Sequence, residues 1–255
     1  MSYSLENAQN FNWSSVSGNL NSERVSHLET YLVGNKILDA GCGGGAFVEF
    51  LSQKGLEVTG VDKYDQFLQV ARERSQTGNY VNGDILNLPF PSKTFDCTYC
   101  FDVLEHVDDR LAIQELIRVT INRVIIAVPK QDELMNKFSL TFFHYQDKTH
   151  LRNYTEASLN ELMAAVNFSN ILIFPELPVQ LQSLVQEMIE FKIEQFAETE
   201  MKLCLLKCLV KNLVKFKKFN FKDSQQEASK ILLKKLLDKA SYKQIHTGLV
   251  AIIDL

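Results

Sequence analysis

The sequence predicts an α/β fold with a mostly parallel β-sheet, and three observations support this. Short apolar segments with strand character alternate with longer segments in which apolar residues recur at helical spacing. One strand segment runs into a glycine-rich stretch, 41–45, which a helical segment follows. The chain closes on another strongly apolar segment, 248–253. Strands that alternate with helices indicate a parallel sheet covered by helices on both faces.

The expected strands are short apolar runs bounded by glycine, proline or polar residues. Before the C-terminal strand they are expected at 36–39, 57–61, 80–81, 95–101, 124–128 and 171–174. The last of these is expected to stop at Pro175 and Pro178.

The expected helices are longer and carry apolar residues three or four positions apart. They are expected at 20–33, 46–53, 66–74, 111–119 and 155–166. The second is expected to stop before Gly55, and Thr155 is a plausible N-cap for the last one.

A long segment without glycine or proline, 180–243, interrupts this alternation. It is rich in Leu and Lys, and two or three helices fit it best. Because the strand at 248–253 follows it, we interpret the segment as a helical insertion within a single domain spanning 1–255, rather than a second domain in series.

The composition excludes several classes of protein. With 45% hydrophobic and 23% charged residues, the chain is neither disordered nor collagen-like. No apolar run approaches the ~20 residues that span a bilayer, and the N-terminus lacks the features of a secretory signal. Five cysteines at irregular spacing argue against a disulfide framework, and no Cys/His group has zinc-ligand spacing. We therefore expect a cytoplasmic protein.

The net charge of −4 conceals two unlike parts. Residues 201–243 hold 12 Lys and 3 acidic residues, a net of +9, and the remaining residues carry a net of −13. On a helical wheel, four lysines of this segment fall on one stripe, opposite leucines and valines. Three interpretations remain open: a helix packed on the body with solvated lysines, a cap over the active site, or a contact surface for a dimer or an anionic membrane.

The glycine-rich stretch is the most informative part of the sequence. The segment 37–45 takes a strand through a glycine turn to the start of a helix, where a ligand can approach the backbone closely. Gly41, Gly43 and Ala46 also fit the dinucleotide fingerprint G-x-G-x-x-G/A. On its own the stretch indicates either a nucleotide-type ligand or a structural turn.

Three carboxylates near strand ends narrow the choice. Asp39 precedes the first glycine by two residues, which is awkward beside a pyrophosphate but suits a cationic amino group. Asp62 ends the next strand, where an acid can accept both ribose hydroxyls. Asp84 follows the third strand and could accept from an adenine amino group. A cationic amino-acid end, a ribose and an adenine together describe S-adenosylmethionine.

At these positions the sequence resembles the class I S-adenosylmethionine-dependent methyltransferases, over roughly 35–175 and the last strand. The segment 101–107 looks like the one after the fourth strand in small-molecule and natural-product members. One departure is the link before the last strand, which is usually short in the family. The matching segments are 39–45, 61–62, 84, 88–91, 95–96 and 101–107.

The resemblance implies a Rossmann-like sheet of seven strands, mostly parallel with an antiparallel last strand, and S-adenosylmethionine as cofactor. It implies that Asp39 and the backbone at Gly41 and Gly43 face the methionine end of the cofactor, and that Asp62 binds the ribose. It also implies cofactor contacts for further residues. These are Asp84 and Ile85 around the adenine, and Phe101 and Val103 near the sulfonium.

Histidines are the candidates for a catalytic base, since a hydroxyl acceptor must lose its proton during methyl transfer. His106 follows the fourth strand and is either a site residue or a structural one. His144 and His150 follow the fifth strand and are expected to act as base, to orient the substrate or to brace a loop. Their H-x₂-D-x₂-H spacing could suggest a metal, but we expect none. His27 and His246 are distant from the motifs and are interpreted as structural.

The expected function is transfer of a methyl group to a small-molecule acceptor. The accepting atom is expected to be an oxygen of a sugar, lipid-like or natural-product substrate. Three alternatives remain: a nucleic-acid (tRNA) methyltransferase, an NAD-dependent oxidoreductase and a catalytically silent partner subunit. Scattered lysines without arginine in 201–243 make nucleic acid an unlikely partner. Peripheral membrane contact by this segment is compatible with the sequence, as is a monomer or a homodimer.

Overall fold

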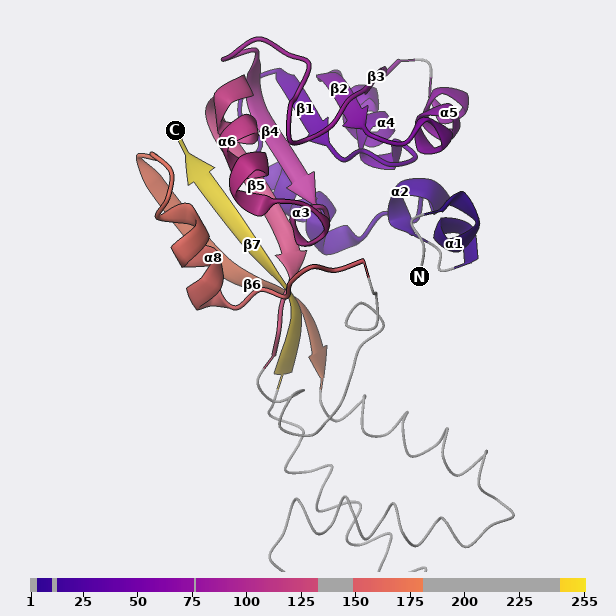
Figure 1. Cartoon of the computed structure of the whole chain (residues 1–255). Helices are drawn as coiled ribbons and strands as arrows, with labels where there is room; N and C mark the ends of the chain where they lie inside the picture. The colour runs from indigo at the N-terminus through magenta and orange to yellow at the C-terminus, as the bar shows by residue number, and fades with distance from the viewer. Residues whose placement is uncertain (1–3, 11–12, 76, 133–148, 181–243) are drawn as a thin grey trace, which may run out of the picture. The chain divides into compact units, whose positions relative to one another are not determined.

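The fold is described from a computed structural model, which describes residues 4–10, 13–75, 77–132, 149–180 and 244–255 (Figure 1). The chain divides into two compact units. The second unit comprises Asp132–Leu140 and Pro178–His246, and so includes the predicted insertion, 180–243, together with a separate earlier segment. Apart from its first residue, that insertion lies outside the described residues, so its predicted helices and its role as a cap stay predictions. The remaining unit, called the body below, carries the sheet.

A seven-stranded sheet forms the body, in the order β3-β2-β1-β4-β5-β7-β6. The pairs β1–β2, β2–β3, β1–β4 and β4–β5 are parallel, whereas β7 pairs antiparallel with β5. The predicted sheet, including its antiparallel last strand, is therefore confirmed. The strands are β1 Lys36–Ala40, β2 Glu57–Asp62, β3 Asn79–Asn82, β4 Phe95–Phe101, β5 Thr120–Pro129, β6 Asn170–Gln180 and β7 Gln244–Asp254.

All the helices predicted in the body are present. The structure adds two helices before α3 and one 3-10 turn, η1, that were not predicted. The additional elements are too short to show a periodic apolar pattern. Asn21 caps α3 by accepting the backbone N–H groups of Glu23 and Arg24, and Thr155 caps α8 as predicted. The helices are α1 Leu5–Asn10, α2 Ser14–Ser17, α3 Ser22–Tyr31, α4 Ala46–Gln53, α5 Asp65–Arg74, η1 Leu104–His106, α6 Asp109–Val119 and α8 Glu156–Met163.

The sheet separates two apolar cores. Helices α6 and α8 contribute buried residues to the core on one face, while α3, α4 and α5 contribute to the core on the other (Figure 1). Neighbouring residues of β5 alternate between the two: Ile126 packs in the first core and Ile125 in the second. Because strand side chains alternate between faces, this strand is continuously apolar and buried over 124–129, as expected of a strand covered on both sides.

Strand β6 corrects the predicted end of the strand at 171–174. The strand runs from Asn170 to Gln180 and passes through both Pro175 and Pro178. Proline was expected to end it because proline lacks the N–H that a ladder needs. The sheet order places β6 at the edge, and one side of an edge strand needs no ladder hydrogen bonds, so proline is tolerated there.

Among the helices in the described ranges, none is both long enough and apolar enough to cross a membrane.

Candidate active site

The glycine loop between β1 and α4 is shaped by backbone that only glycine adopts readily. Gly41 has a φ of 88°, and a Cβ at this position would lie 2.3 Å from Cγ2 of Val103. The N–H groups of Gly41 and Cys42 both donate to the carbonyl of Val61 at the neighbouring strand. The loop is therefore held against the end of β2, and any side chain at residue 41 would displace Val103.

Asp62 joins the end of β2 to this loop. Its carboxylate accepts the backbone N–H of Gly43 and that of Tyr64, each at 2.9 Å. Burial raises the pKa of the Asp62 carboxyl, and the backbone donors, which favour the charged form, work against that rise. The backbone N–H of Gly43 is thus already engaged by Asp62.

A cavity of about 200 Å³ opens at the carboxyl ends of β1 and β2. Open parallel sheets bind ligands at this edge. Six residues predicted as site residues or cofactor contacts line it together: Gly41, Asp62, Asp84, Ile85, Val103 and His106. The other lining residues are Val61, Lys63, Tyr64, Gly83, Val107 and Thr149.

Asp84 stands at the rim of the cavity, beyond the end of β3. Oδ2 of Asp84 pairs with Nζ of Lys63 at 2.7 Å, and Oδ1 accepts the backbone N–H of Leu86 at 3.0 Å. The hydrogen bond from Lys63 lowers the pKa of Asp84 below its usual value. The side chain therefore presents a charged carboxylate beside the buried side chain of Ile85.

Asp39 lies at the end of β1 but is not among the residues that line the cavity. Its side chain is buried, and burial raises the pKa of Asp39 to about 8, while the nearby Tyr99 hydroxyl acts to lower it. A carboxyl group with this pKa is largely neutral at pH 7. A cationic group placed next to it would favour its charged form.

Phe101 also lies outside the lining of the cavity. Its ring packs edge-on against Phe47, with the centroids 5.6 Å apart, and the guanidinium of Arg24 lies 5.2 Å from its centroid. The proposed contact of Phe101 with a cofactor stays a prediction. Val103, two residues further on, reaches the cavity instead.

Two of the three candidate histidines meet at the wall of the cavity. The rings of His106 and His150 stand edge to face, with centroids 4.6 Å apart. Nδ1 of His106 lies 3.0 Å from the hydroxyl of Thr149 and 3.3 Å from its carbonyl oxygen. The segment just before α8 is thereby held against η1. The third candidate, His144, lies outside the described residues.

Glu105 completes this group, although the sequence did not single it out. Its side chain is fully buried, and Oε1 lies 3.9 Å from Nε2 of His106. One ligand-type atom from each of Glu105, His106 and His150 lies within 4.8 Å of the other two. The predicted H-x₂-D-x₂-H metal spacing is not what brings them together, since Glu105 and His106 come from η1.

Several cavity residues carry no signal in the sequence. Lys63, Tyr64 and Thr149 lie beside predicted site residues, but none belongs to a recognisable motif. Their positions follow from the ends of β2 and of the loop before α8, so they could be found only once those ends were placed.

The cavity fits the predicted cofactor. Gly41 and Gly83 both line it, and a Cβ at either residue would lie within 3 Å of a neighbouring side chain. The wall therefore packs closely at these two residues and leaves no room for a side chain at either. The polar groups that face the space include the carboxylates of Asp62 and Asp84, which are acceptors for hydroxyl and amino donors of a nucleoside.

Comparison with known proteins finds methyltransferases. Residues 38–128 match a family described as "Methyltransferase domain". The chain is 35% identical over 102 residues to a "Ubiquinone biosynthesis O-methyltransferase" of Idiomarina loihiensis, covering 37% of this chain and 42% of that protein. It is 35% identical over 99 residues to a "Malonyl-[acyl-carrier protein] O-methyltransferase" of Serratia marcescens, covering 38% of this chain and 39% of that protein. The matches span about two fifths of these relatives' length.

Solved structures share the fold. A SAM-dependent methyltransferase from Archaeoglobus fulgidus matches with a TM-score of 0.62 at 17% identity, covering the whole of both chains. A phosphoethanolamine N-methyltransferase 2 from Haemonchus contortus, solved with S-adenosyl-L-methionine, matches with a TM-score of 0.57 at 18% identity, covering 96% of this chain and 56% of that one. Residues 38–128 therefore form a methyltransferase domain, and the body has the fold of these S-adenosylmethionine-dependent methyltransferase structures.

Proposed function

We propose that the protein transfers a methyl group from S-adenosylmethionine to an oxygen atom of a small-molecule acceptor. The observation that carries this proposal is the shared cavity, in which Asp62, Asp84 and His106 surround one space at the carboxyl edge of the sheet. It puts the groups expected to hold a nucleoside next to a group able to accept a proton.

The residues that would hold the cofactor follow from their positions. Asp62 keeps acceptor capacity beyond its backbone donors and would accept the ribose hydroxyls. Asp84 and Ile85 would bracket the adenine, one as acceptor and one as apolar contact. Asp39 and Gly41 would face the methionine end. When bound, the cofactor supplies an activated methyl group, so the chain itself has to align and desolvate the acceptor.

His106 is the proposed base. If Nδ1–H donates to Thr149, Nε2 carries the lone pair that would take the acceptor's proton. Thr149 fixes the orientation of the ring, and His150 packs against it. Glu105, 3.9 Å from Nε2, would stabilise the positive charge that the ring gains. General-base help of this kind contributes roughly 10²–10⁴-fold to a rate.

The names of the relatives support oxygen as the accepting atom. Both are called O-methyltransferases. A hydroxyl acceptor has a proton to lose and needs the base, whereas a carboxylate acceptor does not. The effect of removing His106 therefore reports on which kind of oxygen is methylated.

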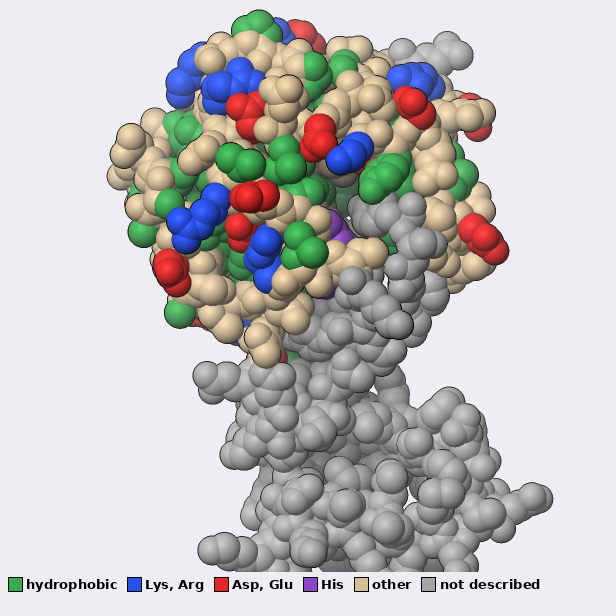
Figure 2. All heavy atoms as spheres, viewed as in Figure 1, with side chains coloured by type: hydrophobic (Ala, Val, Ile, Leu, Met, Phe, Trp, Pro, Cys, Tyr) green, Lys and Arg blue, Asp and Glu red, His purple; other side chains and the backbone are tan. Residues whose placement is uncertain are grey.

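The alternatives receive less support. On the described face shown in Figure 2, acidic and basic side chains are interspersed, and no basic patch gathers there. This lends nothing to a nucleic-acid substrate, whose phosphates attract clustered Lys and Arg. The comparisons favour methyl transfer over an NAD-dependent oxidoreductase. Contacts made by the Lys-rich segment, the oligomeric state and a cytoplasmic location stay predictions.

Methyl transfer is tested with labelled S-adenosylmethionine and a panel of acceptors that bear phenolic, sugar or carboxylic oxygens. We expect label in the phenolic or sugar products and formation of S-adenosylhomocysteine. A protein that binds the cofactor and yet labels no acceptor of any class would favour the catalytically silent alternative. Label confined to transfer RNA would favour the nucleic-acid alternative.

A further inference from the structure

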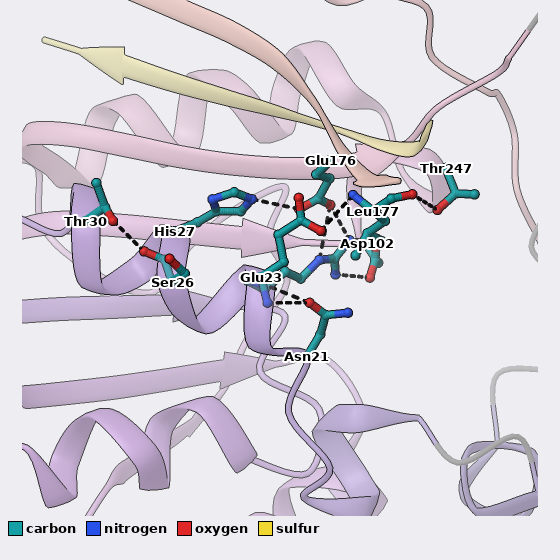
Figure 3. Close-up of polar contacts among 10 residues, drawn as sticks. Asn21, Glu23, Ser26, His27, Thr30, Asp102, Glu176, Leu177 and Thr247 are labelled. Atoms are coloured by element: carbon teal, nitrogen blue, oxygen red, sulfur yellow. Dashed lines mark hydrogen bonds and ion pairs between the residues drawn. The ribbon is translucent and has the colours of Figure 1, made fainter. Parts of the chain in front are cut away.

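The first turn of α3 reaches two strained points of the body (Figure 3). Asp102, directly after β4, and Leu177, within β6, both have a φ of 55°, which is unusual for residues other than glycine. Arg24 binds the side chain of Asp102, and Glu23 accepts the backbone N–H of Leu177 at 3.0 Å. Glu23 and Arg24, adjacent on α3, thus contact two residues elsewhere in the body whose backbone is left-handed.

Arg24 is held in a buried polar network. Its guanidinium donates to both carboxylate oxygens of Asp102, through Nη1 to Oδ2 and through Nη2 to Oδ1 at 2.9 Å. It also donates to Oε1 of Glu176, from Nη2 at 2.9 Å and from Nε at 3.2 Å. Oε2 of Glu176 lies 3.4 Å from Nε2 of His27. His27, interpreted above as distant from the motifs, is therefore linked to the end of β4.

Asp102 is the residue through which this network reaches the cavity. Its backbone N–H donates to the carbonyl of Ala127 on β5, which fixes one side of the residue. The next residue, Val103, lines the cavity and fills the space that a side chain on Gly41 would take. The carbonyl of Val103 accepts the backbone N–H of His106, so one turn connects Asp102 to the proposed base.

We propose that Arg24 is a positioning residue for the cofactor cavity, because its two-pronged pairing with Asp102 holds the left-handed backbone that seats Val103 against Gly41 and orients η1. Asp tolerates the left-handed region better than most residues, but one residue in this region still carries strain. Without the guanidinium, the backbone at residue 102 relaxes and the wall formed by Val103 and His106 shifts. This inference rests on the proposed function.

The test compares four variants by calorimetric titration with S-adenosylhomocysteine and by steady-state kinetics. Arg24→Gln alone would remove the guanidinium that pairs with the buried carboxylate of Glu176. The main variant is therefore the double substitution Arg24→Gln/Glu176→Gln, which removes one charge of each sign. Asp102 is half-exposed and stays hydrated in it. We expect a roughly 5- to 30-fold loss of affinity, the range that one left-handed residue accounts for, and a larger fall in kcat than rise in KM.

Asp102→Asn is the conservative variant. Asparagine tolerates the left-handed region and can still accept from Arg24, so affinity and kcat are expected to return close to those of the unchanged protein. Asp102→Ala keeps neither property and is expected to match the double variant. If Asp102→Asn and Asp102→Ala behaved alike, the pairing would have no positioning role.

Glu23→Gln is the matched control on the same helical turn. It weakens the contact with Leu177 but leaves Arg24 and Asp102 intact, so it is expected to lower the melting temperature without changing the affinity for S-adenosylhomocysteine. The inference is overturned if Glu23→Gln and the double variant lower affinity equally, or if the double variant folds and binds normally. Failure of the unchanged protein to bind would instead reject the proposed function.

Discussion

The carboxylate of Asp62 accepts the backbone N–H of Gly43 at 2.9 Å, and this bond ties the acid proposed to bind the ribose to the glycine loop. The carbonyl of Val61, one residue earlier, accepts the N–H groups of Gly41 and Cys42. The end of β2 therefore shapes the loop as well as contributing its own side chain. Cofactor binding and loop geometry should respond together when Asp62 is changed.

Replacing Asp62 by Ala is predicted to weaken S-adenosylhomocysteine binding by at least about 100-fold. Two hydrogen bonds from the ribose to a charged group are lost, each worth roughly 1.5–3 kcal/mol, and Gly43 loses its acceptor. Isothermal titration checks the affinity. The control is Asp65→Ala, which removes an exposed carboxylate that bonds Asn82 and should bind normally. Equal affinities for the two variants would contradict the assigned role.

Gly41→Ala is predicted to abolish measurable cofactor binding while the protein still folds. The new Cβ would meet Val103 at 2.3 Å, and the backbone is left-handed at φ 88°. The control is Gly55→Ala, whose φ of 86° is equally left-handed but whose Cβ would meet nothing within 4 Å. We expect Gly55→Ala to lower stability by about 1–2 kcal/mol and to leave affinity unchanged. Binding lost in both variants would point to strain rather than to the wall of the cavity.

Asp39 is predicted to make cofactor affinity depend on pH. Burial raises its pKa to about 8, so below that pH binding of a cationic amino group releases a proton. Affinity should rise between pH 6 and 8 and level off above pH 8. Titrations in buffers of different ionisation enthalpy count the released protons. In Asp39→Asn the proton release should vanish and the affinity should become flat across this range; an unchanged pH profile would remove Asp39 from the site.

The same carboxyl makes a prediction for stability without cofactor. Because its pKa is raised above the ordinary 3.8, the folded protein holds a proton that the unfolded chain releases between about pH 4 and 8. The stabilisation is complete below pH 4 and is lost as pH rises through 8. Urea denaturation across this range should show a decline that is absent from Asp39→Asn. A decline of the same size in both proteins would assign it to other groups.

His106→Ala is predicted to lower kcat for a hydroxyl acceptor by roughly 10²–10⁴-fold with cofactor affinity kept within about twofold. His150→Ala and His144→Ala test the other two candidates, and a smaller loss is expected for His150 because it contacts the ring of His106 rather than the acceptor. His246→Ala is the control. Undiminished turnover in all three candidate variants would exclude histidine as the base.

Much of the body could be predicted because its signals are local. The bounds of α4 follow from the glycine turn before it and Gly55 after it, and β4 was predicted over its whole length. The predicted end of β6 was wrong because an edge strand tolerates proline. Which strand lies at the edge depends on the order of the whole sheet, which no local segment reveals.

The site was predictable where a residue lies at the end of a strand or within a few residues after it. Gly41, Asp62 and Asp84 line the cavity because the ends of parallel strands meet at one edge. Arg24 gave no signal, since its partner Glu176 is 152 residues away. A charged residue in an amphipathic helix is ordinarily solvated, and only the packed structure shows that this one is buried.

Calorimetric titration of the folded protein with S-adenosylhomocysteine tests the central claim most directly. The account predicts saturable binding of one molecule per chain, weakened strongly by Asp62→Ala and left intact by Asp65→Ala. The account would be contradicted by a protein whose circular dichroism shows an α/β fold but whose titration gives no saturable heat up to about 1 mM ligand. Such a result corresponds to a binding free energy weaker than about −4 kcal/mol.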